Sequence, residues 1–396
     1  MNIGIVTTWF PAGGGYVSKA YKEALSKTHK VFIYARGGQN MQGNSDWDDE
    51  SVTWAPYHNN DIKTRHLIDW AKNKKIDLLF FNEQRYWEPV IAAKKAGFCI
   101  GSYIDYYTQE TVPAFGLYDF LICNTKRHYS VFNWHKKAHY IPWGTDINKF
   151  APANTVKDKV TFIISAGWQG KYSKDRRGTL LAIKAFNNVK GACKLIVYSQ
   201  VKYNDCLPEW QGLIGGDNRI EFKYGTFDPF PYTAGDVYLY PSRLDGIGLT
   251  LPEALSSGLA AITTNSPPMN EFVTDDFNGI LVNVVKYLGR SDGYYWAESI
   301  CNLESLTEAM QIYVNDKNIL LEHKLNARNS AVDYLDWKKN ALHIPDIFEN
   351  EMEFNNKGID RYIENIALQL DKAMSPSILY KFKSALYSLY RYFIKK

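Results

Sequence analysis

The sequence predicts an α/β protein with two doubly wound parallel sheets, one in each half of the chain. Strand patterns alternate with helical patterns in both halves, as they do in sheets covered by helices on both faces. A polar, turn-rich segment at residues 140–159 separates the two series and is the expected linker. A length of 396 residues also exceeds one comfortable hydrophobic core, so two domains are expected.

In the first half, five strand patterns alternate with three helical ones. The strands are IGIVTT, KVFIYA, IDLLFFN, FCIGSYI and DFLICNT, and the helices are YVSKAYKEALSK, KTRHLIDWAKNKK and EPVIAAKKAG. We place the N-terminal domain at residues 1–150.

The second half repeats the alternation. Its strand patterns are VTFIISAG, KLIVYSQ, RIEFKYG, GDVYLY and LAAITT, and a helical pattern, RGTLLAIKAFNNV, follows the first of them. PEALSSG predicts a further helix, with Pro252 at the first helical position and Gly258 as its stop. We place the second domain at residues 151–345 and a helical tail at 346–396.

Composition limits the classes of function. A hydrophobic share of 45% and a charged share of 22% are typical of a soluble globular protein. The net charge of +4 is too small and too scattered to favour a nucleic-acid partner. The five cysteines are far apart and form no CxxC pair, which indicates reduced core thiols of a cytoplasmic protein. Apolar runs are too short for a transmembrane helix.

An Asp-x-Asp pair, Asp46 and Asp48, is the only candidate for a cation site that the sequence offers. It lies in an acidic polar loop without a second cluster of ligands, and the histidines show no metal-binding spacing. We therefore expect a solvated loop and no metal.

A glycine run at residues 13–15 follows the first strand and precedes a helix. It reads either as a tight strand-to-helix turn or as a place where backbone N–H groups approach a phosphate. A dinucleotide-binding dehydrogenase is disfavoured, because the second strand ends in Arg36 where an acid is needed.

A basic loop, GKYSKDRRG, follows the first strand of the second half. Its cations are Lys171, Lys174, Arg176 and Arg177. They are either solvated surface residues or the countercharge for a diphosphate at the carboxyl edge of the sheet, where ligands of parallel sheets bind.

Two acids lie eight residues apart beyond the strand GDVYLY. Glu253 alone is explained as a carboxylate that favours a helix N-terminus. Asp245 and the intervening glycines, Gly246 and Gly248, are not explained in that way. If the glycines let this segment fold back, both acids and several N–H groups line one site. Acids accept from sugar hydroxyls and N–H groups donate to phosphate, so this pattern predicts a nucleotide-sugar ligand.

The segment at residues 241–282, PSRLDGIGLTLPEALSSGLAAITTNSPPMNEFVTDDFNGILV, resembles the signature of the group 1 glycosyltransferases, family GT4, of GT-B fold. The shared pattern is proline-serine, an acid, Gly-x-Gly-Leu, Glu-Ala, a glycine before a strand, a loop ending in glutamate, and Gly-x-Leu-Val. The resemblance extends to YIPWGTDINKF, to GTLLAIKAF and to the N-terminal glycine loop, so it covers about residues 1–335.

The resemblance implies a GT-B fold, in which two Rossmann-like domains face a cleft, the first on the acceptor side and the second binding the donor. It also implies roles for individual residues. Glu253 would hold the ribose of the donor. Asp245, where the family usually has glutamate, would contact hydroxyls of the donor sugar. Backbone contacts to the sugar or diphosphate are implied for Gly14, Gly15, Gly246, Ile247, Gly248 and Leu249.

Two departures from the family pattern move candidate roles to other residues. Trp168 stands where the family commonly has arginine, so the cation facing the phosphate is expected at Arg177, Lys171 or Lys174. Many members have His before Asp on an N-domain strand, whereas SYIDYY offers only Asp105, which becomes the candidate at the reacting centre.

The resemblance implies a retaining hexosyltransferase that uses a nucleoside-diphosphate sugar as substrate and needs no cofactor. The expected acceptor is a glycan or lipid-linked precursor of polysaccharide biosynthesis. A sugar-nucleotide epimerase of the same fold and a non-catalytic nucleotide-sugar-binding subunit remain alternatives.

The tail at residues 376–396, PSILYKFKSALYSLYRYFIKK, contains five cations and no acid. Its apolar stripe at helical spacing favours either a helix docked on the fold or an interfacial helix on anionic lipid. The second alternative predicts peripheral attachment at the inner face of the membrane.

Overall fold

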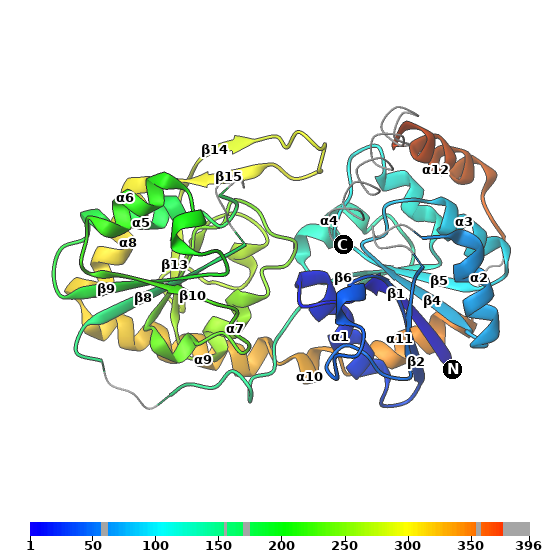
Figure 1. Cartoon of the computed structure of the whole chain (residues 1–396), viewed down its shortest axis with the longest axis horizontal. Coiled ribbons are helices and arrows are strands. Elements are labelled where there is room, and N and C mark those ends of the chain that lie inside the picture. Colours follow the sequence, from blue (N-terminus) through cyan, green and yellow to red (C-terminus); the bar gives the residue numbers. More distant parts are fainter. Residues whose placement is uncertain (57–61, 154–156, 169–174, 354–357, 375–396) are drawn as a thin grey trace, which may run out of the picture. The chain divides into compact units, whose positions relative to one another are not determined.

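A computed structural model describes residues 1–56, 62–153, 157–168, 175–353 and 358–374 (Figure 1). By their internal contacts these residues form two compact units. Unit 1 contains Met1–Ser102, Glu110–Phe120 and the described residues from Phe348 onward, and unit 2 contains Tyr103–Gln109 and Leu121–Ile347. The domain limits at 150 and 345 stay a prediction.

Two parallel sheets organise the described residues, as expected from the sequence. The larger has seven strands in the order β3-β2-β1-β4-β5-β6-β7. Its strands are β1 (Asn2–Thr8), β2 (Lys30–Gly37), β3 (Val52–Trp54), β4 (Leu78–Asn82), β5 (Cys99–Tyr103), β6 (Phe120–Cys123) and β7 (Ala138–Tyr140). Consecutive residues of β1 from Ile3 to Thr8 and all of β4 are buried, as expected for a parallel sheet covered on both faces.

The smaller sheet has six strands in the order β10-β9-β8-β11-β12-β13. They are β8 (Val160–Gly167), β9 (Cys193–Ser199), β10 (Ile220–Tyr224), β11 (Val237–Tyr240), β12 (Ala260–Thr264) and β13 (Gly279–Val282). The chain leaves β8 toward β9 on one side, and later returns to β11 on the other. This reversal makes the carboxyl ends of β8 and β11 a topological switch point, where open α/β sheets bind ligands.

Helices connect the strands and cover the sheets. They are α1 (Gly13–Leu25), α2 (Thr64–Asn73), α3 (Glu88–Lys95), α4 (Lys126–Phe132), α5 (Thr179–Asn188), α6 (Pro208–Gly215), α7 (Thr250–Ser256), α8 (Leu303–Asn315), α9 (Lys317–Tyr334), α10 (Trp337–Asn340), α11 (Ile344–Glu353) and α12 (Arg361–Met374). The expected first residue of α7 was wrong: the helix begins two residues before Pro252. Gly258 follows α7 with φ +73, as a helix stop requires.

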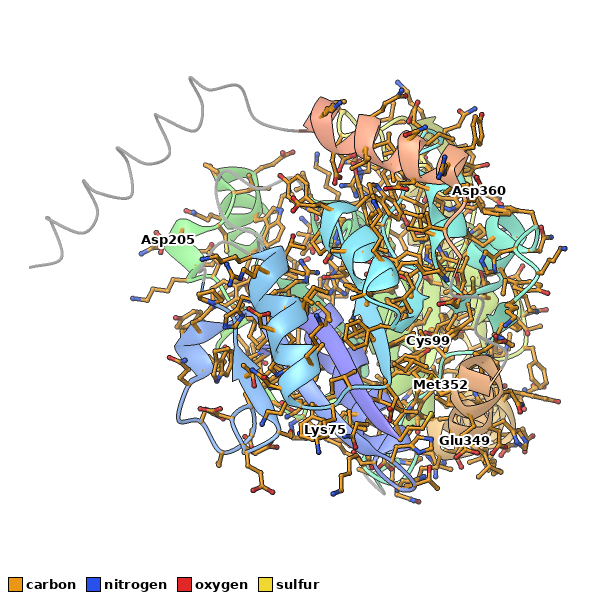
Figure 2. All side chains as sticks on the ribbon, turned by 90° about the vertical axis from the view of Figure 1, so that its right-hand side faces the viewer. Lys75, Cys99, Asp205, Glu349, Met352 and Asp360 are labelled. Carbon is orange, nitrogen blue, oxygen red and sulfur yellow. The ribbon has the colours of Figure 1, made fainter. Side chains whose placement is uncertain are left out.

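Unit 1 is completed by the end of the described chain. Phe348 of α11 is fully buried against Phe80 and Phe120, with ring centroids 5.0 and 5.1 Å away. Cys99 Sγ lies 3.7 Å from the carbonyl oxygen of Glu351 on the same helix, a region that the labels of Cys99 and Met352 mark in Figure 2. From α12, the Asp371 carboxylate accepts from the backbone N–H groups of Trp87 and Glu88 at 2.8 Å, at the start of α3.

An antiparallel hairpin in unit 2 interrupts the α/β alternation, and the sequence did not predict it. Its strands are β14 (Val284–Leu288) and β15 (Glu298–Cys301), and Figure 1 shows it extending beyond the six-stranded sheet. All five cysteines are buried thiols. Among the helices of the described segments, none is long and apolar enough to cross a membrane.

Candidate active site

The loops that follow β8 and β11 meet at the switch point of the six-stranded sheet. The backbone N–H of Arg243 donates to the carbonyl oxygen of Arg176 at 2.8 Å, which ties the two loops together. Gly178 has φ +68, and a Cβ at this position would lie 2.1 Å from the carbonyl oxygen of Pro241, so only glycine permits this approach. The basic loop and the loop at residues 241–249, which contains Asp245, are therefore neighbours, as the sequence predicted. We call the second of these the acidic loop.

Asp245 occupies the centre of this region and is held by hydrogen bonds to both carboxylate oxygens. The Tyr240 hydroxyl donates to Oδ2 at 2.5 Å, and the N–H of Gly246 donates to Oδ1 at 2.8 Å. Burial by itself raises the pKa of Asp245, but the charges of Arg176 and Arg177 and these hydrogen bonds outweigh it and lower the pKa. Asp245 is therefore a fixed carboxylate at neutral pH.

Arg177 is one of the three cations that the sequence predicts to face the phosphate, and it lies within the described residues. Its Nη1 donates to the Tyr240 hydroxyl at 3.2 Å, and its guanidinium carbon lies 5.4 Å from the centre of the same ring. Burial would lower the pKa of Arg177, but the neighbouring tyrosines and Asp245 raise it, so the side chain stays charged. Lys171 and Lys174, the other two candidates, lie outside the described residues.

The N-terminus of α5, beside the basic loop, is already occupied by a carboxylate of the chain. Asp175 accepts from the N–H groups of Thr179 at 2.9 Å and Leu180 at 2.7 Å. An anion at this edge of the sheet would therefore bind to the arginines of the basic loop and to the backbone N–H groups of the acidic loop.

Glu253 lies in the first turn of α7, as predicted, and has a partner of its own. The Tyr232 hydroxyl donates to its Oε2 at 2.7 Å. Burial raises the pKa of Glu253 to about 7, against the opposing effects of that hydrogen bond and of the Lys149 charge. Asp245 and Glu253 thus differ in protonation near neutral pH.

Three buried tyrosines connect Glu253 with Asp245. The rings of Tyr238 and Tyr240 are stacked with centroids 5.7 Å apart, and Tyr232 meets Tyr238 edge-on at 5.6 Å. The charge of Arg177 acts on both acids and on all three tyrosines. One arginine, two acids and three phenols therefore form a single electrostatic cluster, which we call the tyrosine cluster. Tyr232 and Tyr240 are functional candidates that the sequence reasoning missed.

The loop between the two acids approaches Asp105 closely. A Cβ built on Gly246 would lie 2.2 Å from Asp105 Oδ1, so any side chain there would displace the Asp105 carboxylate. Gly248 has φ +88, which favours glycine, and Ile247 is buried. Asp105, Asp245 and the loop at 246–249 are thus brought together within unit 2.

Two further residues that the sequence reasoning missed, Arg127 and His128, hold this loop from α4. Arg127 is buried, and its Nη2 donates to the carbonyl oxygens of Asp245 at 2.6 Å and Gly246 at 3.2 Å. His128 Nε2 lies 3.2 Å from the same Gly246 oxygen. Burial and the charge of Arg127 hold the pKa of His128 well below its usual range, so the imidazole is neutral. Their only sequence signal is their place directly after the buried strand DFLIC.

Glu271 fixes the start of α4 from the other side. Its carboxylate accepts from the N–H groups of Lys126 at 2.6 Å and Arg127 at 2.9 Å. Glu271, which ends a loop within the signature segment, therefore orients Arg127 on the loop at 246–249.

In unit 1, the glycine run lies at the start of α1 as predicted. A Cβ on Gly15 would lie 2.1 Å from the carbonyl oxygen of Phe10, so the tight-turn interpretation explains this glycine. A Cβ on Gly14 would lie 2.8 Å from the Glu83 carboxylate. Contacts of Gly14 and Gly15 with a phosphate stay a prediction.

The remaining candidates are structural. Arg36 is buried and donates to the carbonyl oxygens of Asn82 at 2.8 Å and Glu83 at 2.5 Å, so its contacts are structural. Asp46 is exposed as expected. Asp48 is partly exposed, and it also accepts from Gly43 N at 2.7 Å and Trp54 Nε1 at 2.9 Å, which stabilises the loop. Within the described ranges, no group of three or more His, Cys, Asp or Glu residues is placed to hold a metal ion.

Comparisons with known proteins bear on the family and the fold. Residues 153–286 match the family model "Glycosyl transferases group 1". A curated Escherichia coli relative, a UDP-Gal:alpha-D-GlcNAc-diphosphoundecaprenol alpha-1,3-galactosyltransferase, is 25% identical over 231 residues, which are 54% of each chain. The match thus spans about half of the relative's length.

Solved structures share the fold across most of the chain at low sequence identity. Sucrose-phosphate synthase from Thermosynechococcus elongatus has a TM-score of 0.67 at 14% identity, covering 90% of this chain and 100% of that one. HepE from Anabaena, in complex with UDP and glucose, has a TM-score of 0.66 at 14% identity, covering 88% and 100%.

The two-sheet α/β architecture is therefore the GT-B fold of glycosyltransferases. Within that fold, residues 153–286 are the part of the chain that is similar to the group 1 glycosyltransferases.

Proposed function

We propose that this enzyme is a retaining hexosyltransferase, which moves a sugar from a nucleoside-diphosphate sugar to a lipid-linked or cell-surface glycan precursor. The donor class is supported by the HepE structure with UDP and glucose. The acceptor class is supported by the E. coli relative, which acts on a diphosphoundecaprenol-linked GlcNAc. The proposal includes no metal and no cofactor beside the donor.

The tyrosine cluster carries this proposal. Glu253, with a pKa of about 7, and Asp245, ionised and doubly hydrogen-bonded, act on one arginine at the switch point. A nucleoside-diphosphate sugar has both kinds of group that this cluster suits. Its hydroxyls donate to carboxylates, and its diphosphate accepts from an arginine.

Each residue then has a role. Glu253 accepts from the ribose hydroxyls, and Asp245 from the donor sugar. N–H groups of the loop at 246–249 and the cation of Arg177 face the diphosphate, together with Lys171 or Lys174. Asp105, next to Gly246, lies at the reacting centre.

The reaction in this proposal breaks the bond between the anomeric carbon and the diphosphate oxygen. The acceptor oxygen bonds to the anomeric carbon on the same face, and the acceptor proton passes to the leaving diphosphate. The protein stabilises the negative charge that develops on the diphosphate, which Arg177 is placed to do.

The decisive experiment combines binding with product analysis. Thermal shift with UDP, GDP and ADP sugars identifies the donor, because a bound donor stabilises the native state. The purified enzyme is then incubated with that donor and a GlcNAc-diphosphate that carries a short alkyl chain. NMR of the product should show a new glycosidic bond with the anomeric configuration of the donor.

Three other outcomes overturn parts of the proposal. An inverted bond contradicts retention. A free epimerised sugar nucleotide supports the epimerase. Donor binding without transfer and without slow donor hydrolysis supports the non-catalytic subunit.

We also propose that the basic tail attaches the enzyme to the membrane near its acceptor. Residues 375–396 lie outside the described residues, and the composition of the tail supports this attachment. Five cations near an anionic surface add about 1 kcal/mol each, enough for reversible attachment. A chain cut after Met374 should still bind donor but no longer sediment with phosphatidylglycerol vesicles. Full-length protein that ignores these vesicles at low salt contradicts the attachment.

A further inference from the structure

The loop of the β14–β15 hairpin, residues 289–297, is a second candidate binding surface, which we call the hairpin tip. It follows the residues matched by the family model, which end at 286. The tip packs on the segment that contains Asp105. The N–H of Tyr295 donates to the carbonyl oxygen of Tyr107 at 2.9 Å, and Tyr294 forms a β-bridge with Thr108.

The tip also fixes Asp105 in place. The Tyr294 hydroxyl donates to the backbone oxygen of Asp105 at 3.2 Å. Tyr106 donates to the carbonyl oxygen of Asp292 at 2.9 Å, and its ring stacks on Tyr294 at 5.3 Å. A molecule bound on the tip therefore lies beside the proposed reacting centre.

A chain of hydrogen bonds connects the tip with the loop at 246–249. Trp296 Nε1 donates to the Tyr107 hydroxyl at 2.6 Å, and that hydroxyl lies 3.0 Å from His128 Nδ1. His128 Nε2 faces the carbonyl oxygen of Gly246 at 3.2 Å. Because a carbonyl only accepts, the neutral ring carries its proton on Nε2, and Nδ1 accepts from Tyr107. In this series of hydrogen bonds, Trp296, Tyr107 and His128 each donate in the direction of Gly246.

The tip exposes the groups that recognise carbohydrate. The rings of Tyr106 and Tyr295 are 38% and 43% exposed, although both are held in place by ring contacts. Beside them lies the ion pair of Arg290 and Asp292, a planar donor and an acceptor of hydroxyl hydrogen bonds. Fixed aromatic faces cover the C–H faces of a sugar ring, while the charged pair reaches its hydroxyls.

We propose that the hairpin tip, together with Tyr106, binds the sugar ring of the acceptor and presents its hydroxyl to the reacting centre at Asp105. This inference rests on the proposed function, since it assigns the acceptor of the same reaction. The occupant is a hexose or N-acetylhexosamine ring, and the lipid or glycan attached to it extends away from Asp105.

The test uses the full-length protein saturated with its preferred nucleoside diphosphate. Saturation-transfer NMR is recorded with the methyl α-glycosides of glucose, galactose, mannose and N-acetylglucosamine as probes. At least one should bind. Tyr295→Ala should weaken that sugar's binding at least fivefold, and Tyr295→Trp, which keeps an aromatic face, should restore it. The matched control is Tyr287→Ala, on β14 of the same hairpin and 59% exposed, which should change nothing.

Binding of the nucleoside diphosphate by thermal shift separates the two proposals. If it is retained while none of the four glycosides binds, or while Tyr295→Ala leaves their affinity unchanged, the hairpin inference is overturned and the donor site stands. If no nucleoside diphosphate binds, the proposed function itself fails.

Discussion

The hydroxyl of Tyr240 joins the two charges of the site: it accepts from Arg177 and donates to Asp245 at 2.5 Å. The Tyr240 hydroxyl therefore connects the guanidinium to the carboxylate by two hydrogen bonds and fixes the orientation of the carboxylate. A hydrogen bond to a charged group contributes about 1.5–3 kcal/mol.

Tyr240→Phe should lower kcat by about 10–100-fold, because Asp245 loses its orientation toward the donor sugar. Donor affinity should change less than threefold, as the ribose contact at Glu253 is untouched. The matched control is Tyr238→Phe, whose hydroxyl donates to Thr250 Oγ1 rather than to an acid. An equal loss of kcat in both variants contradicts the role of Tyr240.

Glu253→Ala should raise the apparent Kd of the donor at least tenfold, since a half-buried ribose contact is lost. Calorimetric titration with the donor identified by thermal shift measures this directly. Unchanged donor affinity in a folded variant removes Glu253 from the ribose site.

Stability should depend on pH through Glu253. Its pKa rises from 4.5 to about 7 on folding, so the native state binds more protons than the unfolded state between these values. Stability contributed at this site is therefore lost as pH rises from about 4.5 to 7, by about 1–3 kcal/mol. Glu253→Gln should melt at the wild-type temperature near pH 4 and several degrees higher at pH 8, by calorimetry.

Donor affinity should show the opposite trend at the same carboxyl. The ionised form accepts more hydrogen bonds from ribose, so the wild-type Kd should fall as pH rises through 7, and the Gln variant should lose that dependence. A Kd that is independent of pH in the wild type contradicts a raised pKa at Glu253.

His128→Phe should destabilise the enzyme by about 1–3 kcal/mol and raise the donor Kd, because Tyr107 and the Gly246 carbonyl lose a buried partner. Chemical denaturation and donor titration measure the two effects. His343→Phe is the control, since that imidazole is exposed and faces only Asp346. If both variants behave alike, His128 does not position the loop.

Activity should survive EDTA. The two acids of the Asp-x-Asp should also differ in the effect of their removal. Asp46→Ala should leave stability and activity unchanged. Asp48→Ala should lower the free energy of unfolding by about 1–3 kcal/mol with no specific loss of catalysis. An EDTA-sensitive enzyme that Mn²⁺ restores, or equal effects of both substitutions on kcat, contradicts this assignment.

The regular parts of the fold were predictable because both sheets are parallel and buried on two faces. Strands such as KVFIYA and VYLY are apolar, and glycine or proline punctuates the loops beside them. The β14–β15 hairpin was not predictable in this way. Its first strand, VVKYL, is apolar in sequence although Val285 and Tyr287 are each 59% exposed, and its partner strand, ESIC, has no apolar run.

The site was predictable only where function depends on local spacing. Asp245, Glu253 and the glycines between them lie within nine residues, and their pattern is legible on the chain. Arg127 and His128 reach Gly246 across 118 or more positions, and Tyr240 reads as one more strand aromatic. Such partners are set by tertiary contacts, which no periodicity encodes.

Unit 1 combines residues 1–102 with α11 and α12, which lie more than 240 positions further along the chain. Phe348 fills the space between Phe80 and Phe120, and Asp371 caps α3 from 284 positions away. A ribosome adds about 5–20 residues each second, so the early strands wait for many seconds before these partners emerge. During synthesis, the face of the seven-stranded sheet that Phe348 covers therefore stays exposed to chaperones until α11 has emerged.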